Sequence, residues 1–95
     1  MGVEPGTMTV TILITPILQQ FTDNRQSIEV EGATVRDCLD RFVARYPDTQ
    51  KWIFGNSKAP LIYIFLNKEV VLPGDLDKDV SEGDVIDLSP VVAGG

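Results

Sequence analysis

One amphipathic segment limits the folds that this chain can adopt. Between Thr34 and Pro47 the apolar residues recur every three or four positions, which places them along one face of a helix: Val35, Cys38, Leu39, Phe42, Val43 and Tyr46. Thr34 is a suitable N-cap, Asp37 is placed to reach back toward it, and Pro47 ends the helix. The opposite face is charged, so we expect the apolar stripe to lie across a sheet.

Two segments before this helix alternate between apolar and polar residues, as strands do when one face is buried. They are residues 9–14 and 27–31, and their inward positions are Val10, Ile12, Ile14, Ile28 and Val30. Pro16 weakens pairing beyond the first segment, and residues 22–27 favour a polar turn. The two segments are therefore predicted to form an antiparallel hairpin.

Three further strand segments are expected after the helix. Residues 61–66 are the most hydrophobic and are predicted to be central, and a short edge segment with Val70 and Leu72 follows. In the last strand, residues 85–88, Ile86 and Leu88 point one way and Asp87 the other. Residues 48–60 are rich in turn formers but contain Trp52, Ile53 and Phe54, so we expect a short helical turn or packed loop over one end of the core.

This order predicts an α+β fold of the ubiquitin-like β-grasp type. A mixed sheet of four to five strands would pack one main helix on one face, with the last strand parallel to the first at the sheet centre. Residues 1–8 are expected to be a flexible leader, residues 9–89 the domain, and residues 90–95 a flexible, extended tail. Proline stiffens the root of that tail, and Gly94 and Gly95 free its tip.

Composition excludes several classes of function. The net charge of −6 and the pI near 4.3 disfavour nucleic-acid binding and favour a basic protein partner. The longest apolar run, residues 61–66, is too short for a membrane span, which needs about 20 residues. A single cysteine forbids an internal disulfide, and a reducing cytoplasm is the simplest location. No histidine is present, so Ser-His-Asp and Cys-His catalytic arrangements are impossible.

Three local features each have a structural and a functional interpretation. Cys38 lies on the helical stripe, which favours a buried structural cysteine over a sulfur-relay thiol. Residues 75–86 resemble a calcium loop, but Val80 and Ile86 occupy positions that need glycine and glutamate, so no metal is predicted. Half of the 14 acidic residues lie in residues 69–87. They form either a solvated acidic face or a docking surface for a basic partner.

The open side of the sheet is the expected partner interface. The strand at residues 61–66 exposes either Tyr63 and Phe65 or Ile62 and Ile64. Exposed apolar residues on that side would form the kind of patch that marks a partner site. We predict such a patch at Phe65, with Leu72 and Leu88 nearby, although core positions are the alternative for each.

Three stretches resemble the MoaD/ThiS family of small sulfur-carrier proteins: GDVIDLSPVVAGG at residues 83–95, VTILITPILQQFT at 10–22 and TVRDCLDRF at 34–42. The resemblance covers residues 8–95. Its most specific element is the ending PVVAGG, which has one valine more than the family's commonest P-V-x-G-G. The stretch TPILQQFTDN and the long segment 47–60 are most similar to the sulfur carriers of cysteine biosynthesis and to longer MoaD-like proteins.

The resemblance implies that Gly95 is the reactive residue, at the end of a tail made by Val91, Val92, Ala93 and Gly94. Its carboxylate would be adenylated and then converted to a thiocarboxylate that donates sulfur in cysteine or molybdopterin biosynthesis. The chain would be a protein substrate rather than an enzyme, with no bound cofactor, and ATP would be used by the partner.

The implied partners are an E1-like adenylating enzyme and a sulfur donor such as a cysteine desulfurase or a rhodanese-like protein. The acceptor would be a PLP-dependent cysteine synthase or the large subunit of molybdopterin synthase; a thiazole synthase fits least well. Two alternatives remain: a ubiquitin-like modifier joined to lysines through Gly95, and a β-grasp domain with an inert tail.

Overall fold

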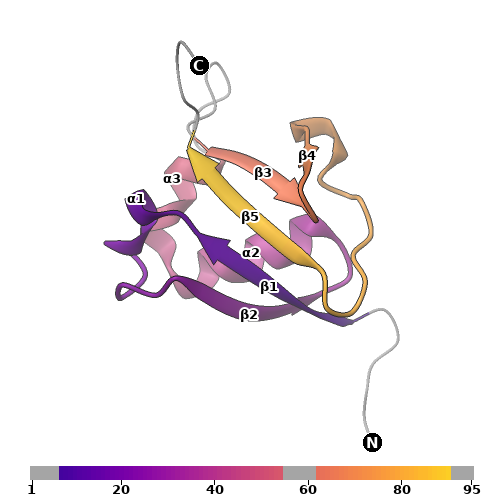
Figure 1. Cartoon of the computed structure of the whole chain (residues 1–95), viewed down its shortest axis with the longest axis horizontal. Coiled ribbons are helices and arrows are strands. Elements are labelled where there is room, and N and C mark those ends of the chain that lie inside the picture. Colours follow the sequence, from indigo (N-terminus) through magenta and orange to yellow (C-terminus); the bar gives the residue numbers. More distant parts are fainter. Residues whose placement is uncertain (1–6, 55–61, 91–95) are drawn as a thin grey trace, which may run out of the picture.

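The computed structural model describes residues 7–54 and 62–90. Five strands in these ranges form one mixed sheet: β1 (Met8–Ile14), β2 (Ser27–Gly32), β3 (Ile62–Leu66), β4 (Glu69–Val71) and β5 (Val85–Pro90). Their spatial order is β2-β1-β5-β3-β4 (Figure 1). β1 is antiparallel to β2 and parallel to β5, while β3 is antiparallel to both β5 and β4. The predicted hairpin, the mixed sheet and the parallel pairing of first and last strands are confirmed.

One detail of the predicted sheet is wrong. The hydrophobic segment 61–66 was expected to be central, and β3 does have a strand on each side, but the middle strand is β5. Hydrophobicity did not distinguish the two positions because both strands bury alternate residues against the same core, Ile62, Ile64 and Leu66 from β3 and Ile86 and Leu88 from β5.

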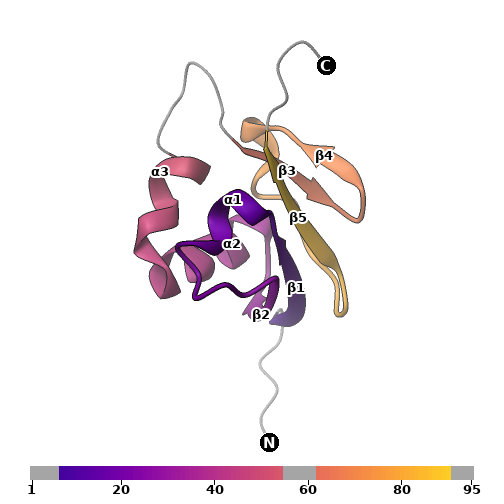
Figure 2. The same ribbon diagram turned by 60° about the vertical axis from the view of Figure 1, so that its left-hand side comes forward.

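The helices all cover one face of the sheet (Figure 2). The main helix α2 (Val35–Arg45) packs its predicted stripe on that face, with Val35, Cys38, Leu39 and Phe42 fully buried. The short helix α1 (Pro16–Gln19) follows β1, and a 3₁₀ turn (Pro47–Thr49) leads into α3 (Gln50–Ile53). The expected helical turn over one end of the core is therefore present, while residues 55–61 lie outside the described ranges.

The N-terminus of α2 is secured both by its own capping residues and by the segment before β5. Thr34 Oγ1 accepts from the Asp37 amide at 3.1 Å, as predicted, and the Asp37 carboxylate reaches back to the Ala33 amide at 3.1 Å rather than to Thr34. The next free donors, the amides of Val35 and Arg36, bond to carbonyls of Lys78 and Leu76 at 3.0 and 2.8 Å. The segment before β5 is thereby fixed to the start of the helix.

Tight turns set the register of the second half of the sheet. Asn67 and Lys68 both have positive φ, 50° and 75°, the conformation that suits a two-residue hairpin turn between β3 and β4. Asn67 also donates to Asp84 and accepts from the Val85 amide, both at 3.0 Å, which ties this turn to the start of β5. Gly83, at φ 86°, occupies the predicted turn before β5, where a side chain would be strained.

Candidate site at the end of the central strand

The tail begins at the end of the middle strand of the sheet. β5 runs to Pro90, which lies opposite Ile62 on β3, and Ser89 lies opposite Tyr63. β3 therefore holds β5 in place up to Pro90, while the pairing with β1 ends at Leu88. The predicted tail residues Val91, Val92, Ala93, Gly94 and Gly95 lie outside the described ranges.

An apolar patch lies on the open face of the sheet beside this strand. Leu13, Asp87, Phe65 and Val70 form one row across β1, β5, β3 and β4, because each is the register partner of the next. Tyr63 stands next to Phe65, with ring centroids 6.4 Å apart in an edge-to-face arrangement. We call the five apolar residues on this side the open-face patch: Leu13, Tyr63, Phe65, Val70 and Leu72.

The residues of the open-face patch are unusually exposed for their type. The exposed fraction is 38% for Leu13, 44% for Tyr63, 49% for Val70 and 57% for Leu72, and Phe65 is half-buried. Neighbouring apolar side chains that remain in contact with water are a common mark of a partner-binding surface. Asp87 in the same row places negative charge beside the patch.

Of the three residues predicted for this surface, the structure places two on it. Phe65 and Leu72 belong to the open-face patch, whereas Leu88 is only 2% exposed and lies in the core with Ile14 and Ile64 as its register partners. The prediction for Leu88 is wrong because the alternation in β5 puts Leu88 with Ile86, on the helix side. Leu13 was missed, although its alternation with Ile12 and Ile14 already assigned it to the open face.

Cys38 is built into the core and is unsuited to sulfur transfer. It is fully buried, and burial, with a smaller contribution from Asp37, raises the pKa of the thiol from 9.0 to about 11. The thiolate is the reactive form of cysteine, so this environment keeps the sulfur protonated and unreactive at neutral pH. The structural interpretation of Cys38 is the one that this geometry supports.

The acidic stretch before β5 is partly occupied with holding turns together. The Asp84 carboxylate accepts from the Ser81 amide at 2.7 Å, and Glu82 accepts from the Thr9 amide at 2.9 Å. Asp77 pairs with Arg36 at 3.1 Å, but both side chains are exposed, so the pair adds little stability.

Within the described residues, no three His, Cys, Asp or Glu side chains gather in a way that could hold a metal ion. In the same ranges no helix has the length and apolar character required to cross a bilayer.

Comparisons with known proteins agree on the fold, and the family match extends to residue 95. The model of the ThiS family matches residues 12–95. The sulfur carrier protein CysO of Mycobacterium tuberculosis is 27% identical over 93 residues, which cover 93% of this chain and 100% of CysO. Among solved structures, the BexX/CysO complex of Amycolatopsis orientalis contains a chain 31% identical, with a TM-score of 0.77, covering 90% of this chain and 99% of that one. SAMP1 of Haloferax volcanii, a small archaeal modifier protein, is 25% identical with a TM-score of 0.73, covering 92% and 99%.

Proposed function

This chain belongs to the ThiS family, and from that premise we propose that it is a sulfur carrier whose Gly95 carboxylate is adenylated and then converted to a thiocarboxylate. The observation that supports this most strongly is the extent of the family match, which includes both final glycines. Similarity to CysO, itself named a sulfur carrier protein, points the same way.

The position of the last strand supports the proposal. β5 is paired with β1 up to Leu88 and with β3 up to Pro90, and five residues follow it in the sequence, 91–95. A fully extended segment of that length reaches about 17 Å. The terminal carboxylate can thus enter a partner's active site while the folded domain stays outside it. Glycine at the last two positions adds no side chain that would obstruct a narrow channel or crowd the reacting carbonyl carbon.

The chemistry explains why the carboxylate must be activated. A carboxylate is a weak electrophile, so its oxygen first attacks the α-phosphate of ATP, forming an acyl-adenylate and releasing pyrophosphate. Hydrosulfide then displaces AMP and leaves the thiocarboxylate; a protein persulfide gives an acyl disulfide, which a second thiol reduces to the same product. The adenylating site and the sulfur donor, a desulfurase or a rhodanese-like protein, belong to other proteins in this proposal.

We assign the open-face patch as the docking surface for the adenylating enzyme. Its residues lie on β1 and β3, which flank β5, and on or next to β4, so a partner seated there would receive the tail directly from Pro90. Phe65 and Leu72 are its most useful test positions, because neither contributes to the fully buried core. The acceptor of the sulfur is proposed to be a PLP-dependent cysteine synthase, on the basis of the similarity to CysO, with the large subunit of molybdopterin synthase as the alternative acceptor.

Mass spectrometry of the intact protein tests the carrier function. Protein purified from its native host is expected to contain a fraction in which one oxygen atom is replaced by sulfur at Gly95. An alkylating reagent selective for thiocarboxylates should label that fraction, even when Cys38 is replaced by alanine. Gly95→Ala should fold normally but give no exchange, because the added methyl group crowds the reacting carbon. Sulfur exchange in a chain lacking Gly94 and Gly95 would contradict the proposal.

A second function is favoured by the similarity to SAMP1, whose name describes a protein modifier. Here the adenylated Gly95 would be attacked by a lysine amine, giving an isopeptide bond in place of a thiocarboxylate. The same purified material distinguishes the two functions. Lysines of other proteins carrying residues 79–95 of this chain, the fragment that trypsin leaves because its last cleavage site is Lys78, would indicate the modifier if sulfur exchange at Gly95 is absent.

A further inference from the structure

β2 forms one edge of the sheet, and its outer main-chain groups are available for another strand. Within the described residues β2 pairs only with β1. The Ile14 amide donates to the Gln26 carbonyl at 2.8 Å, which sets the alternation of the ladder. Gln26, Ile28, Val30 and Gly32 therefore direct their N–H and C=O groups toward β1, while Ser27, Glu29 and Glu31 direct theirs toward the open edge.

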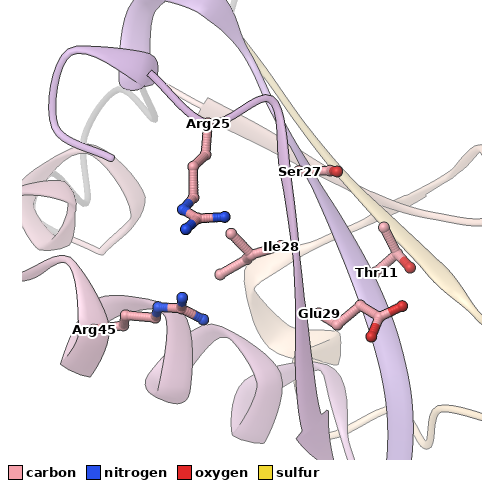
Figure 3. Close-up of a pocket in the computed structure, with 6 residues that line it drawn as sticks. All are labelled: Thr11, Arg25, Ser27, Ile28, Glu29 and Arg45. Atoms are coloured by element: carbon pink, nitrogen blue, oxygen red, sulfur yellow. The ribbon is translucent and has the colours of Figure 1, made fainter. Parts of the chain in front are cut away.

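A hollow of about 520 Å³ lies along this edge, and two arginines enter it. It is lined by Thr11, Arg25, Ser27, Ile28, Glu29 and Arg45. Figure 3 shows Arg25, from the turn before β2, and Arg45, from the end of α2, on the side of β2 away from β1, both reaching toward Ile28. The guanidinium groups thus occupy the region beside which an added strand would run. Glu29 points to the other side of β2, away from both arginines.

The charges in the hollow are unbalanced. Among the described residues the only ion pair joins Arg36 to Asp77, so neither Arg25 nor Arg45 has a carboxylate partner there. Two guanidinium groups converge without an anion between them, in a protein whose net charge is −6. Arg45 is also held in place by the Tyr46 ring, with its guanidinium carbon 5.5 Å from the ring centroid. A site of this kind is complementary to carboxylates.

We propose that β2 accepts an extended acidic peptide segment of a partner protein as an additional strand. The peptide main chain would hydrogen-bond to Ser27, Glu29 and Glu31, and its carboxylates would lie between Arg25 and Arg45. Alternation assigns the pattern of the peptide. Acidic residues belong at every second position, on the helix side, and uncharged or basic residues between them, because Glu29 and Glu31 on the other side repel acids.

This surface is separate from the one proposed for the adenylating enzyme. Four of the five residues of the open-face patch lie on or next to β3 and β4, whereas the strand-addition site lies at the opposite edge of the sheet (Figure 1). The fifth, Leu13, comes nearest to that site, because it is the register partner of Ser27. A partner peptide on β2 and an enzyme on the open face can therefore bind at the same time. The β2 site provides a second contact that is independent of the tail, so its existence does not depend on the chemistry at Gly95.

A pair of synthetic peptides tests the proposal by NMR with the full chain. The probe is Ac-Thr-Glu-Thr-Ile-Thr-Glu-Thr-NH2, with both glutamates on one side, and its control replaces the two glutamates by glutamine. The probe is expected to shift the amide signals of Ser27, Glu29 and Glu31 and to protect them from hydrogen exchange. The glutamine peptide should bind about tenfold more weakly, the change expected from losing charge-assisted hydrogen bonds.

Variants and a modified peptide separate the two parts of the site. Arg25→Ala and Arg45→Ala should each weaken probe binding by about tenfold, while Arg41→Ala, an exposed arginine on α2 that does not line the hollow, should have no effect. A probe with N-methylated amides on its β2-facing residues should not bind. Equal binding by the glutamine or the N-methylated peptide overturns the proposal. The proposal is also overturned if the probe shifts only the amide signals of Tyr63 and Phe65, or if it does not bind at millimolar concentration. Pairing of β2 with β2 of a second copy, without peptide, would overturn it as well.

Discussion

The two faces of the sheet have similar apolar side chains but opposite environments. On the helix side, Val10, Ile12 and Ile86 are completely buried beneath α2. On the open side, Leu13, Tyr63 and Leu72 belong to the same sheet but remain 38–57% exposed. The face covered by the helices, called the closed face below, accounts for folding, because burial of its side chains is the main stabilising contribution. The open face adds little to folding, so its apolar residues are better explained by binding.

The largest expected difference between the faces comes from one matched substitution at two leucines. Leu88→Ala removes a side chain that is 2% exposed and should lower the free energy of unfolding by about 2–5 kcal/mol. Leu72→Ala removes one that is 57% exposed and should change it by less than about 0.5 kcal/mol. Urea unfolding of both variants measures the contrast. Equal losses would show that the open face is also part of the folding core.

The next effect concerns pH and the closed face alone. Cys38 has its pKa raised by burial from 9.0 to about 11, so the unfolded chain releases this proton at lower pH than the folded one. The stability associated with Cys38 is therefore complete below pH 9 and is lost between pH 9 and 11, by about 2 kcal/mol. Other groups titrate in the same range, so the measurement is the difference between wild type and Cys38→Ala. A difference that stays constant from pH 8 to 11 would contradict this.

A smaller effect is expected at the start of the helix that covers the closed face. Thr34→Ala removes the oxygen that accepts from the Asp37 amide and should destabilise the protein by about 1 kcal/mol. Thr34→Ser keeps that oxygen and serves as the control. Thermal denaturation of the two variants should show a lower melting temperature for alanine alone. An equal decrease in both would mean that the threonine methyl group, rather than the cap, is responsible.

The smallest effect on stability should accompany a strong effect on function. Leu72→Asp places a charge on the open-face patch, where the side chain is exposed, so the free energy of unfolding should remain nearly unchanged. Adenylation by the partner enzyme should fall by about tenfold or more, as expected when a charge enters an apolar contact. ATP–pyrophosphate exchange measures this, with Asp40→Asn, an exposed acid on α2 and therefore on the other side of the sheet, as control. Unchanged exchange with Leu72→Asp would remove the patch from the proposed docking surface.

The sequence was most informative where one local pattern was sufficient. The α2 stripe and its Thr34 cap, the β1–β2 hairpin and the phase of β5 each followed from spacing within a single segment. Helix α1 was missed because Pro16–Gln19 makes only one turn, too short for a periodic pattern. The place of β3 beside β5, rather than at the centre, depends on pairing between distant segments. Local alternation contains no information about such pairing.

The candidate sites were predictable to different degrees for the same reason. Alternation left open which side of segment 61–66 faces the solvent, and the structure places Phe65 and Leu72 on the open side but Leu88 in the core. Arg25 and Arg45 lie twenty positions apart in the chain, in a turn and at a helix end. Only the packing of α2 against β2 brings them to one hollow. No spacing rule in the sequence would have identified that pair.

The place of β5 in the middle of the sheet also has a mechanical consequence. If a partner draws the tail inward, as the proposed function requires, the force enters the domain at Pro90 and acts along the strand axis. β1 and β3 hold β5 from both sides, so their hydrogen bonds would be loaded in shear together rather than opened one at a time. An edge strand loaded in the same direction would have hydrogen bonds on one side only. In the proposed function, the domain could therefore be pulled by its tail without unravelling.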